Sequence, residues 1–143
     1  MALTDRLLSS GMPTADQLAD VAGAGVEVVI NLAMPNSEEA LPNEAALAGS
    51  LGMKYIGIPV EWERPTPQNL VQFMTAMDAH WAAKVLVHCV ANYRATGFIA
   101  LHRILRLGWE PEEALDDVRR IWNPEDYPVW KAFIEQGIAT NLS

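Results

Sequence analysis

The fold is indicated most clearly by one stretch of the sequence, Lys84-Val85-Leu86-Val87-His88, which is followed by a short loop at Cys89 and then by a helix. A short run of apolar, mostly β-branched residues is typical of a strand buried on both faces of a parallel sheet. The helix is predicted from about Ala95 to Leu107, because Gly108 is a favoured helix stop. A strand that leads directly into a helix is the basic unit of α/β folds.

The same alternation of strands and helices continues on both sides of this stretch. Two more strands are predicted at Val26–Leu32 and Lys54–Val60, with an edge strand at Leu7–Ser9. Helices are predicted from the Thr14/Gln17 capping box to Gly23, over Pro42–Leu51, from Thr66-Pro67 onward, over Pro111–Trp122 and over Glu125–Gln136. Three aromatic residues are expected to dock the last helices onto the sheet: Trp122, Tyr127 and Trp130. The sequence therefore predicts a single α/β domain over residues 1–143, a three-layer sandwich around a mostly parallel four-stranded sheet.

Composition excludes several classes of function. The net charge of −8 argues against nucleic acid as a partner and offers no basic face to a membrane. No apolar run approaches the roughly 20 residues of a membrane span, and the first residues lack a secretory pattern, so a cytoplasmic protein is predicted. One cysteine excludes an internal disulfide, and the three histidines show no metal-ligand spacing, so we predict neither metal nor cofactor. A small anionic ligand is compatible with this charge, because local donors can override the global field.

The chemistry is expected in the loop that follows His88. Ligands of parallel sheets bind beyond the carboxyl ends of the strands, and Cys89 falls at such an end. A strand-to-helix loop directs backbone amides and the positive end of the helix dipole toward one point. This environment favours a thiolate over a thiol, and it equally favours an oxyanion above the sulfur. Arg94 adds a planar fork of donors that suits phosphate, so a nucleophile, an anion cradle and a cation lie within six residues.

These residues resemble the signature loop of protein tyrosine and dual-specificity phosphatases, in which His-Cys follows a Val-rich strand and Arg opens a helix. The chain is also similar to the bacterial phosphatase-like family known from β-lactamase-hydrolase-like proteins. That family's recurring segments correspond here to Gly11-Met12-Pro13, Val29-Ile30-Asn31-Leu32, Ile58-Pro59-Val60 and Pro65-Thr66. The resemblance covers most of residues 7–107. It implies a phosphotyrosine-phosphatase-like fold and a small phosphorylated or other anionic substrate, phosphoproteins included.

The resemblance also implies roles for individual residues. Cys89 would attack phosphorus to form a cysteinyl-phosphate intermediate, and Arg94 would hold the phosphate. His88 would support the loop through hydrogen bonds. The loop residues expected to bind substrate are Val90, Ala91, Asn92, Tyr93, Ala95 and Thr96, with Trp62 as the floor of the pocket.

The general acid is assigned by position. Phosphatases of this group often carry an Asp on the loop after the preceding strand, and here that loop contains Glu61 and Glu63 but no Asp. Either carboxylic acid can protonate a leaving oxygen. Glu63 is preferred because it lies deeper in the loop.

The spacing of the loop departs from the phosphatase pattern. That pattern has five residues between Cys and Arg, whereas only residues 90–93 intervene here. Asn92 stands in the place of a glycine, and Asn tolerates a left-handed backbone. Arg94 arrives one position early, a rotation of about 100° around the helix. Two alternatives therefore stay open: a pseudophosphatase that binds an anion or phosphoprotein without turnover, and a rhodanese-like sulfurtransferase acting through a persulfide on Cys89, since rhodanese loops have this shorter length.

Overall fold

The protein is built around a four-stranded parallel sheet, seen in a computed structural model that describes residues 1–140. Its strands are β1 (Leu7–Ser10), β2 (Val28–Asn31), β3 (Lys54–Gly57) and β4 (Val85–His88), in the order β1-β4-β2-β3. His88 pairs with Ser10 on one side and with Asn31 on the other, so three strands end in register. The predicted sheet is confirmed and is parallel throughout.

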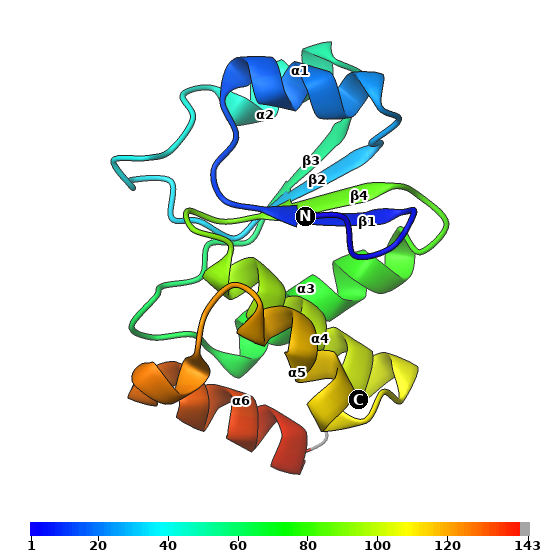
Figure 1. The fold of residues 1–143 in the computed structure, drawn as a ribbon. Helices are drawn as coiled ribbons and strands as arrows, with labels where there is room; N and C mark the ends of the chain where they lie inside the picture. Colours follow the sequence, from blue (N-terminus) through cyan, green and yellow to red (C-terminus); the bar gives the residue numbers. More distant parts are fainter. Residues whose placement is uncertain (141–143) are drawn as a thin grey trace.

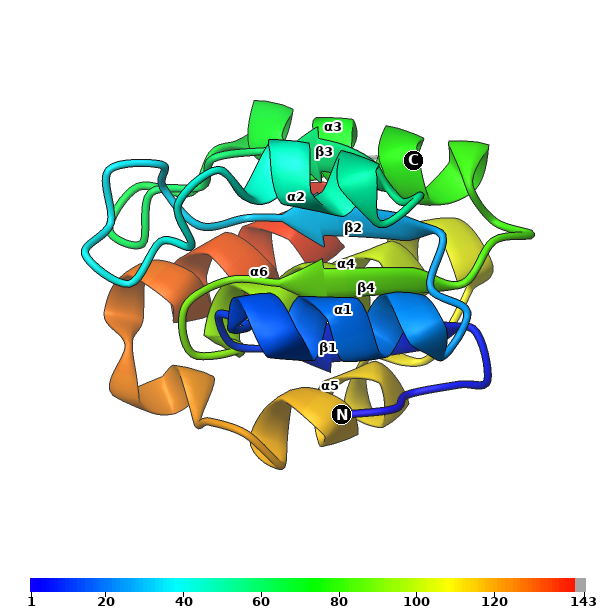
Figure 2. The same cartoon turned by 90° about the horizontal axis from the view of Figure 1, so that it is seen from above.

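Helices cover both faces of the sheet, which gives the predicted three layers (Figure 1). One face carries α1 (Ala15–Gly23), which lies over β1 and β4, and α2 (Glu44–Ser50), which lies over β2 and β3 (Figure 2). The other face carries α3 (Pro67–Ala79), α4 (Tyr93–Leu107), α5 (Pro111–Arg119) and α6 (Pro128–Thr140). A short 3₁₀ turn, Pro124–Asp126, connects α5 to α6. In the described part of the chain, no helix combines the length and the apolar character needed to cross a membrane.

The central strands are uninterrupted apolar runs because both of their faces are buried. Val28 and Ile30 face the larger core, which lies on the side of α3 and α4, whereas Val29 faces the smaller core under α1 and α2. β4 repeats this alternation, with Val87 in the larger core and Leu86 in the smaller. Both cores therefore fix the position at which β4 ends.

Helix bounds with a clear local signal are confirmed, among them the ends of α1 at Gly23 and of α4 at Leu107. Thr14 and Gln17 form the predicted capping box of α1, and Thr66 caps α3 in the same way. The last two predicted helices are shorter or shifted: α5 ends at Arg119, and α6 begins only at Pro128, because Pro is favoured in the first turn.

The C-terminal aromatic residues attach the last helices to α4 and to the loop after β3 rather than directly to the sheet, which corrects the sequence-based prediction. Trp122 Nε1 donates a 3.0 Å hydrogen bond to Thr96 Oγ1 on α4, and Trp130 Nε1 donates one of 2.6 Å to the Trp62 carbonyl oxygen. α5 and α6 both pack on α4, which already occupies this face of the sheet. The docking aromatics therefore end up beside the loop that begins α4.

Candidate active site

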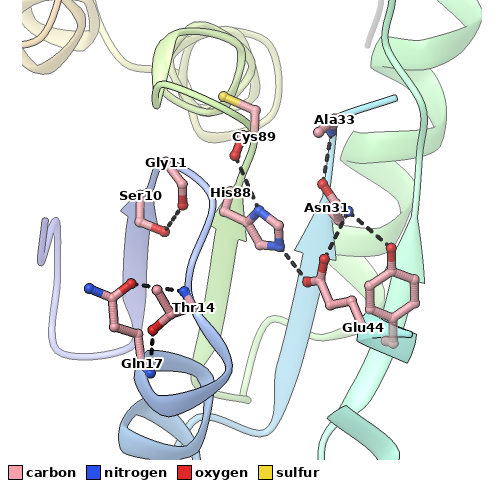
Figure 3. Close-up of polar contacts among 10 residues, drawn as sticks. Ser10, Gly11, Thr14, Gln17, Asn31, Ala33, Glu44, His88 and Cys89 are labelled. Atoms are coloured by element: carbon pink, nitrogen blue, oxygen red, sulfur yellow. Dashed lines mark hydrogen bonds and ion pairs between the residues drawn. The ribbon is translucent and has the colours of Figure 1, made fainter. Parts of the chain in front are cut away.

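Cys89 is one of the residues that line a small pocket beyond the carboxyl end of β4. The pocket has a volume of about 220 Å³ and is lined by Trp62, Cys89, Val90, Ala91, Tyr93, Arg94 and Tyr127. The sulfur points away from the His88 ring (Figure 3). The cysteine is only 1% exposed and also belongs to the larger hydrophobic core. Drug-sized ligands need about 300–1,000 Å³, which makes this pocket suitable for a small group such as a phosphoryl group.

The loop is held by the segment that follows β1. The Cys89 amide donates to the Ser10 carbonyl oxygen (3.3 Å), and the Met12 amide donates to the Val90 carbonyl oxygen (3.0 Å). Gly11 lies so close to the loop that a Cβ atom there would be 2.5 Å from the Val90 oxygen. Only glycine fits at this contact, which accounts for one of the segments on which the family resemblance rests.

Asn92 turns the chain into α4 with a left-handed backbone, φ 69°. This conformation confirms the prediction that Asn replaces the glycine of the phosphatase loop. The helix consequently begins at Tyr93, two residues earlier than predicted, and Arg94 belongs to its first turn.

The backbone amides at the start of α4 are available to an anion. The antiparallel bridge between Gly11 and Ala91 uses the backbone of residues 90–92, whereas the described residues show no acceptor for the amides of residues 93–95, and the Thr96 amide donates to the Asn92 carbonyl oxygen. Consecutive amides at a helix start form a ready site for an oxyanion. The loop therefore has the donors that a phosphoryl group or another oxyanion requires.

Arg94 brings a positive charge to the same pocket. It is 8% exposed, and its Nη1 donates a 2.7 Å hydrogen bond to the Val60 carbonyl oxygen. Among the described residues, no carboxylate forms an ion pair with Arg94. A hydrogen bond from Ser37 is the main cause that lowers the pKa of Glu39, and the charge of Arg94 contributes a smaller part. The pocket thus contains a nearly buried cation that has no carboxylate within ion-pair distance among the described residues.

Aromatic side chains form the wall of the pocket. The Trp62 ring contacts those of Tyr93 and Tyr127, with centroids 5.8 and 5.2 Å apart, and Tyr93 stacks on Trp122 at 5.1 Å. Desolvation raises the pKa of the Tyr127 hydroxyl, with smaller contributions from Tyr93, so this hydroxyl stays neutral. Trp62 therefore lies at the pocket, as predicted, but as one member of an aromatic cluster.

The remaining predicted site residues lie away from the pocket lining. Glu61 forms a 3.0 Å ion pair with Arg64 on the surface, and Glu63 is exposed. Asn92, Ala95 and Thr96 are buried behind the lining. Thr96 Oγ1 donates to the Asn92 carbonyl oxygen at 2.8 Å, so its hydroxyl supports the loop from inside.

A buried polar network behind the loop was missed by sequence reasoning (Figure 3). His88 Nε2 lies 2.5 Å from Glu44 Oε2, and Glu44 Oε1 accepts a 3.1 Å hydrogen bond from Asn31. Glu44 is only 5% exposed although it begins a seven-residue helix. So short a helix has too few residues for periodicity to indicate which face is buried. The sequence therefore gave no signal that this carboxylate faces the sheet.

A cavity of about 390 Å³, larger than the Cys89 pocket, lies at the amino ends of the strands, near the starts of β1 and β4. It is lined partly by Trp81, His102 and Arg103. Arg103 is already paired with Asp117 at 2.7 Å, and this lining contains no nucleophilic thiol. The Cys89 pocket is therefore the better candidate for chemistry.

Comparisons with known proteins identify the family and the fold. No family model matches the chain. A solved DUF442 phosphatase-like protein of Shewanella putrefaciens CN-32 is 38% identical, with a TM-score of 0.87 over 98% of this chain and 88% of that chain. A beta-lactamase hydrolase-like protein of Xylella fastidiosa (strain Temecula1) is 31% identical over 118 residues. That match covers 79% of this chain, which spans only 27% of the length of the curated relative. TpbA of P. aeruginosa, solved in complex with pTyr, is 18% identical with a TM-score of 0.74 over 97% of this chain and 87% of that chain, and it shares the fold.

Proposed function

Because the chain belongs to the DUF442 family of phosphatase-like proteins, we propose that it is a cysteine-dependent phosphomonoesterase of the tyrosine and dual-specificity type. Cys89 is the proposed nucleophile, and Arg94 with the amides of residues 93–95 forms the proposed phosphate site. Small aryl phosphates and phosphotyrosine in proteins are the proposed substrates, because aromatic rings surround the pocket.

The observation that carries this proposal is a nearly buried cation, without a close ion pair, that lines the same pocket as the thiol. A buried charge is costly unless it is paired, and Arg94 has only a neutral carbonyl oxygen as its partner. An anion in the pocket would supply the missing partner for this guanidinium. The free amides at the start of α4 would add donors positioned before the substrate arrives.

The reaction follows from these positions. The Cys89 thiolate forms a bond to phosphorus as the ester P–O bond breaks, and the leaving oxygen takes a proton from an acid or leaves as an anion. Arg94 and the amides hold the three non-bridging oxygens, where negative charge is spread in the transition state. Water then displaces sulfur from phosphorus, which releases inorganic phosphate and restores the thiolate.

The source of the leaving-group proton is proposed from sequence, with Glu63 preferred over Glu61. Neither carboxylate is among the residues that line the pocket. If Glu63 swings inward as the acid, Glu63→Gln should lower kcat for phenyl phosphate more than for p-nitrophenyl phosphate, whose leaving group needs no proton. Glu61→Gln, at the surface ion pair, serves as the matched control. Equal effects of both variants on both substrates would remove Glu63 from the mechanism.

The test of the function is phosphate release from p-nitrophenyl phosphate and from phosphotyrosine peptides. The wild-type chain should release phosphate, and Cys89→Ser should abolish release while phosphate still binds. Binding without turnover by the wild-type chain would support the pseudophosphatase alternative instead. Absence of both binding and turnover would remove the anion site altogether.

Sulfur transfer is a second candidate, favoured by a specific observation. Four residues separate Cys89 from Arg94, as in rhodanese loops, and the pocket lining lacks a carboxylate. In this reaction the thiolate takes the outer sulfur of thiosulfate, releases sulfite, and passes the sulfur to cyanide. Thiocyanate formation that depends on Cys89, without phosphate release, would favour this candidate over the phosphatase.

A further inference from the structure

The buried network behind the loop links four elements of the fold to the reactive cysteine. Glu44 of α2 contacts His88 at the end of β4, and Asn31 of β2 donates to Glu44 Oε1 at 3.1 Å and to the Tyr55 hydroxyl of β3 at 3.0 Å. The Asn31 Oδ1 atom accepts from the Ala33 amide at 2.8 Å, so the amide orientation of Asn31 is fixed. Every polar group in this chain of contacts has a partner.

The partners of His88 determine where its protons lie. His88 Nδ1 faces the Cys89 carbonyl oxygen at 3.3 Å, and a carbonyl oxygen only accepts, so this contact is a hydrogen bond in the tautomer that carries a hydrogen on Nδ1. On the other side of the ring, a single proton must lie between Nε2 and Glu44 Oε2, only 2.5 Å away. Glu44 Oε1 accepts from Asn31, so its carboxylate receives donors at both oxygens. Donors at both oxygens suit an ionised carboxylate, and a protonated His88 Nε2 would supply the second of these donors.

We infer that Glu44 is a positioning residue for Cys89: it keeps a proton on His88 Nε2, and the positive ring it maintains lies behind the cysteine. The His88 ring lies between Cys89 and Glu44 (Figure 3), so the positive partner is nearer to the sulfur than the negative one. The His88–Glu44 pair has no net charge, but its positive member lies on the side of Cys89, so the pair favours a thiolate there. The inference deepens the proposed function, since it concerns how the same nucleophile is prepared.

Other ionisable groups facing this region are few. On the side of Glu44 lies Tyr55, and burial raises the pKa of its hydroxyl, against a hydrogen bond from Asn31 and with a smaller contribution from Glu44, so Tyr55 stays neutral. On the side of the pocket, Arg94 and Tyr93 come from α4, and Tyr127 precedes α6. Glu44 is thus the carboxylate that contacts His88. Its replacement is the most specific way to change the electrostatic potential at Cys89.

The test is the pH profile of Cys89 alkylation by iodoacetamide, followed by mass spectrometry of the intact chain. With Glu44→Gln the ring loses its counter-charge and becomes neutral, so the profile should move to higher pH, and the rate near neutral pH should fall by roughly threefold to tenfold. Glu38→Gln, an exposed carboxylate-to-amide change on the loop before α2, should leave the profile unchanged. In a His88→Asn background, Glu44→Gln should have no further effect, because Glu44 acts through the ring.

An unchanged alkylation profile for Glu44→Gln would overturn the inference. A profile moved to lower pH would also overturn it, because that shift is expected if the Glu44 carboxylate lies beside a neutral ring. Should Glu44→Gln fail to fold, ¹⁵N NMR of the wild-type imidazole decides: both His88 nitrogens protonated near neutral pH supports the pair, and a neutral ring overturns it. Alkylation does not require phosphatase activity. If the alkylation profile moves as predicted but the protein releases no phosphate, the proposed function is rejected and the role of Glu44 is supported.

Discussion

Arg94 and Val60 are joined by a hydrogen bond of 2.7 Å from the guanidinium Nη1 to the carbonyl oxygen. Val60 is itself fixed to the sheet region, because its amide donates to the Leu32 carbonyl oxygen at 3.0 Å. The fold itself, rather than a bound substrate, therefore fixes the position of one edge of the Arg94 guanidinium. Among the described residues, no side chain or carbonyl accepts from the other Arg94 nitrogens, which are left for an anion.

Replacing Arg94 with Lys should separate positive charge from geometry. Lys keeps the charge but lacks the planar fork, so it cannot give an anion two parallel N–H bonds while it donates to Val60. We expect kcat/KM for p-nitrophenyl phosphate to fall by roughly 100-fold, as when one preorganised donor is lost. Arg64→Lys, at the surface pair with Glu61, is the control and should retain wild-type turnover. Full activity in Arg94→Lys would mean that the guanidinium does not hold the phosphate.

Gly11→Ala should damage the loop from outside the pocket. The new Cβ atom would lie 2.5 Å from the Val90 carbonyl oxygen, so the loop or the segment after β1 must move. We expect a loss of about 1–3 kcal/mol in the free energy of unfolding, together with reduced turnover. Gly23→Ala is the matched control, because a Cβ there meets nothing within 4 Å. Urea denaturation of both variants checks this, and equal stabilities would contradict the close approach.

Thr96→Val should lower stability by removing the acceptor of the buried Trp122 indole N–H. Trp122 Nε1 donates to Thr96 Oγ1 at 3.0 Å, and the hydroxyl in turn donates to the Asn92 carbonyl oxygen. An unsatisfied buried donor costs about 1–3 kcal/mol. Thr75→Val, at an exposed position of α3, should change the free energy of unfolding by less than about 0.5 kcal/mol. A Thr96→Val variant as stable as this control would show that the indole finds another partner.

His102 should make stability depend on pH. Burial lowers the pKa of His102, although its hydrogen bond to Asp78 acts in the opposite direction. The folded chain thus binds this proton less readily than the unfolded chain, whose histidine titrates near about 6.5. The stabilising contribution is complete above that pH and is lost as pH falls toward the lower folded value. The free energy of unfolding should therefore drop less steeply with acidification in His102→Gln than in the wild type; parallel curves would refute this role.

The sequence predicted the fold well because its signals are local and agree with one another. Val28–Asn31 and Val85–His88 are short apolar runs buried on both faces, and each is followed by clear turn or helix residues. The left-handed turn at residue 92 was predictable because Asn is one of the few residues that accept it. The capping pair Thr14 and Gln17 fixed the start of α1 in the same local way.

The site was only partly predictable because its key contacts are distant in sequence. Cys89 and Arg94 were identified from their spacing, but the bond from Arg94 to Val60 depends on how α4 meets the segment after β3. The contact of Glu44 with His88 joins residues 44 positions apart. No local pattern reveals such a pair, since an acidic residue at a helix start is normally solvent-exposed.

The central claim is that Cys89 becomes covalently bonded to phosphorus, and acid quenching during turnover tests it most directly. Wild-type chain mixed with p-nitrophenyl phosphate, quenched within one turnover and digested, should carry one phosphoryl group on the peptide that contains Cys89. Cys89→Ser, treated identically, should carry none. Phosphate release by the wild type with no phosphoryl group at Cys89 at any quench time would contradict the account.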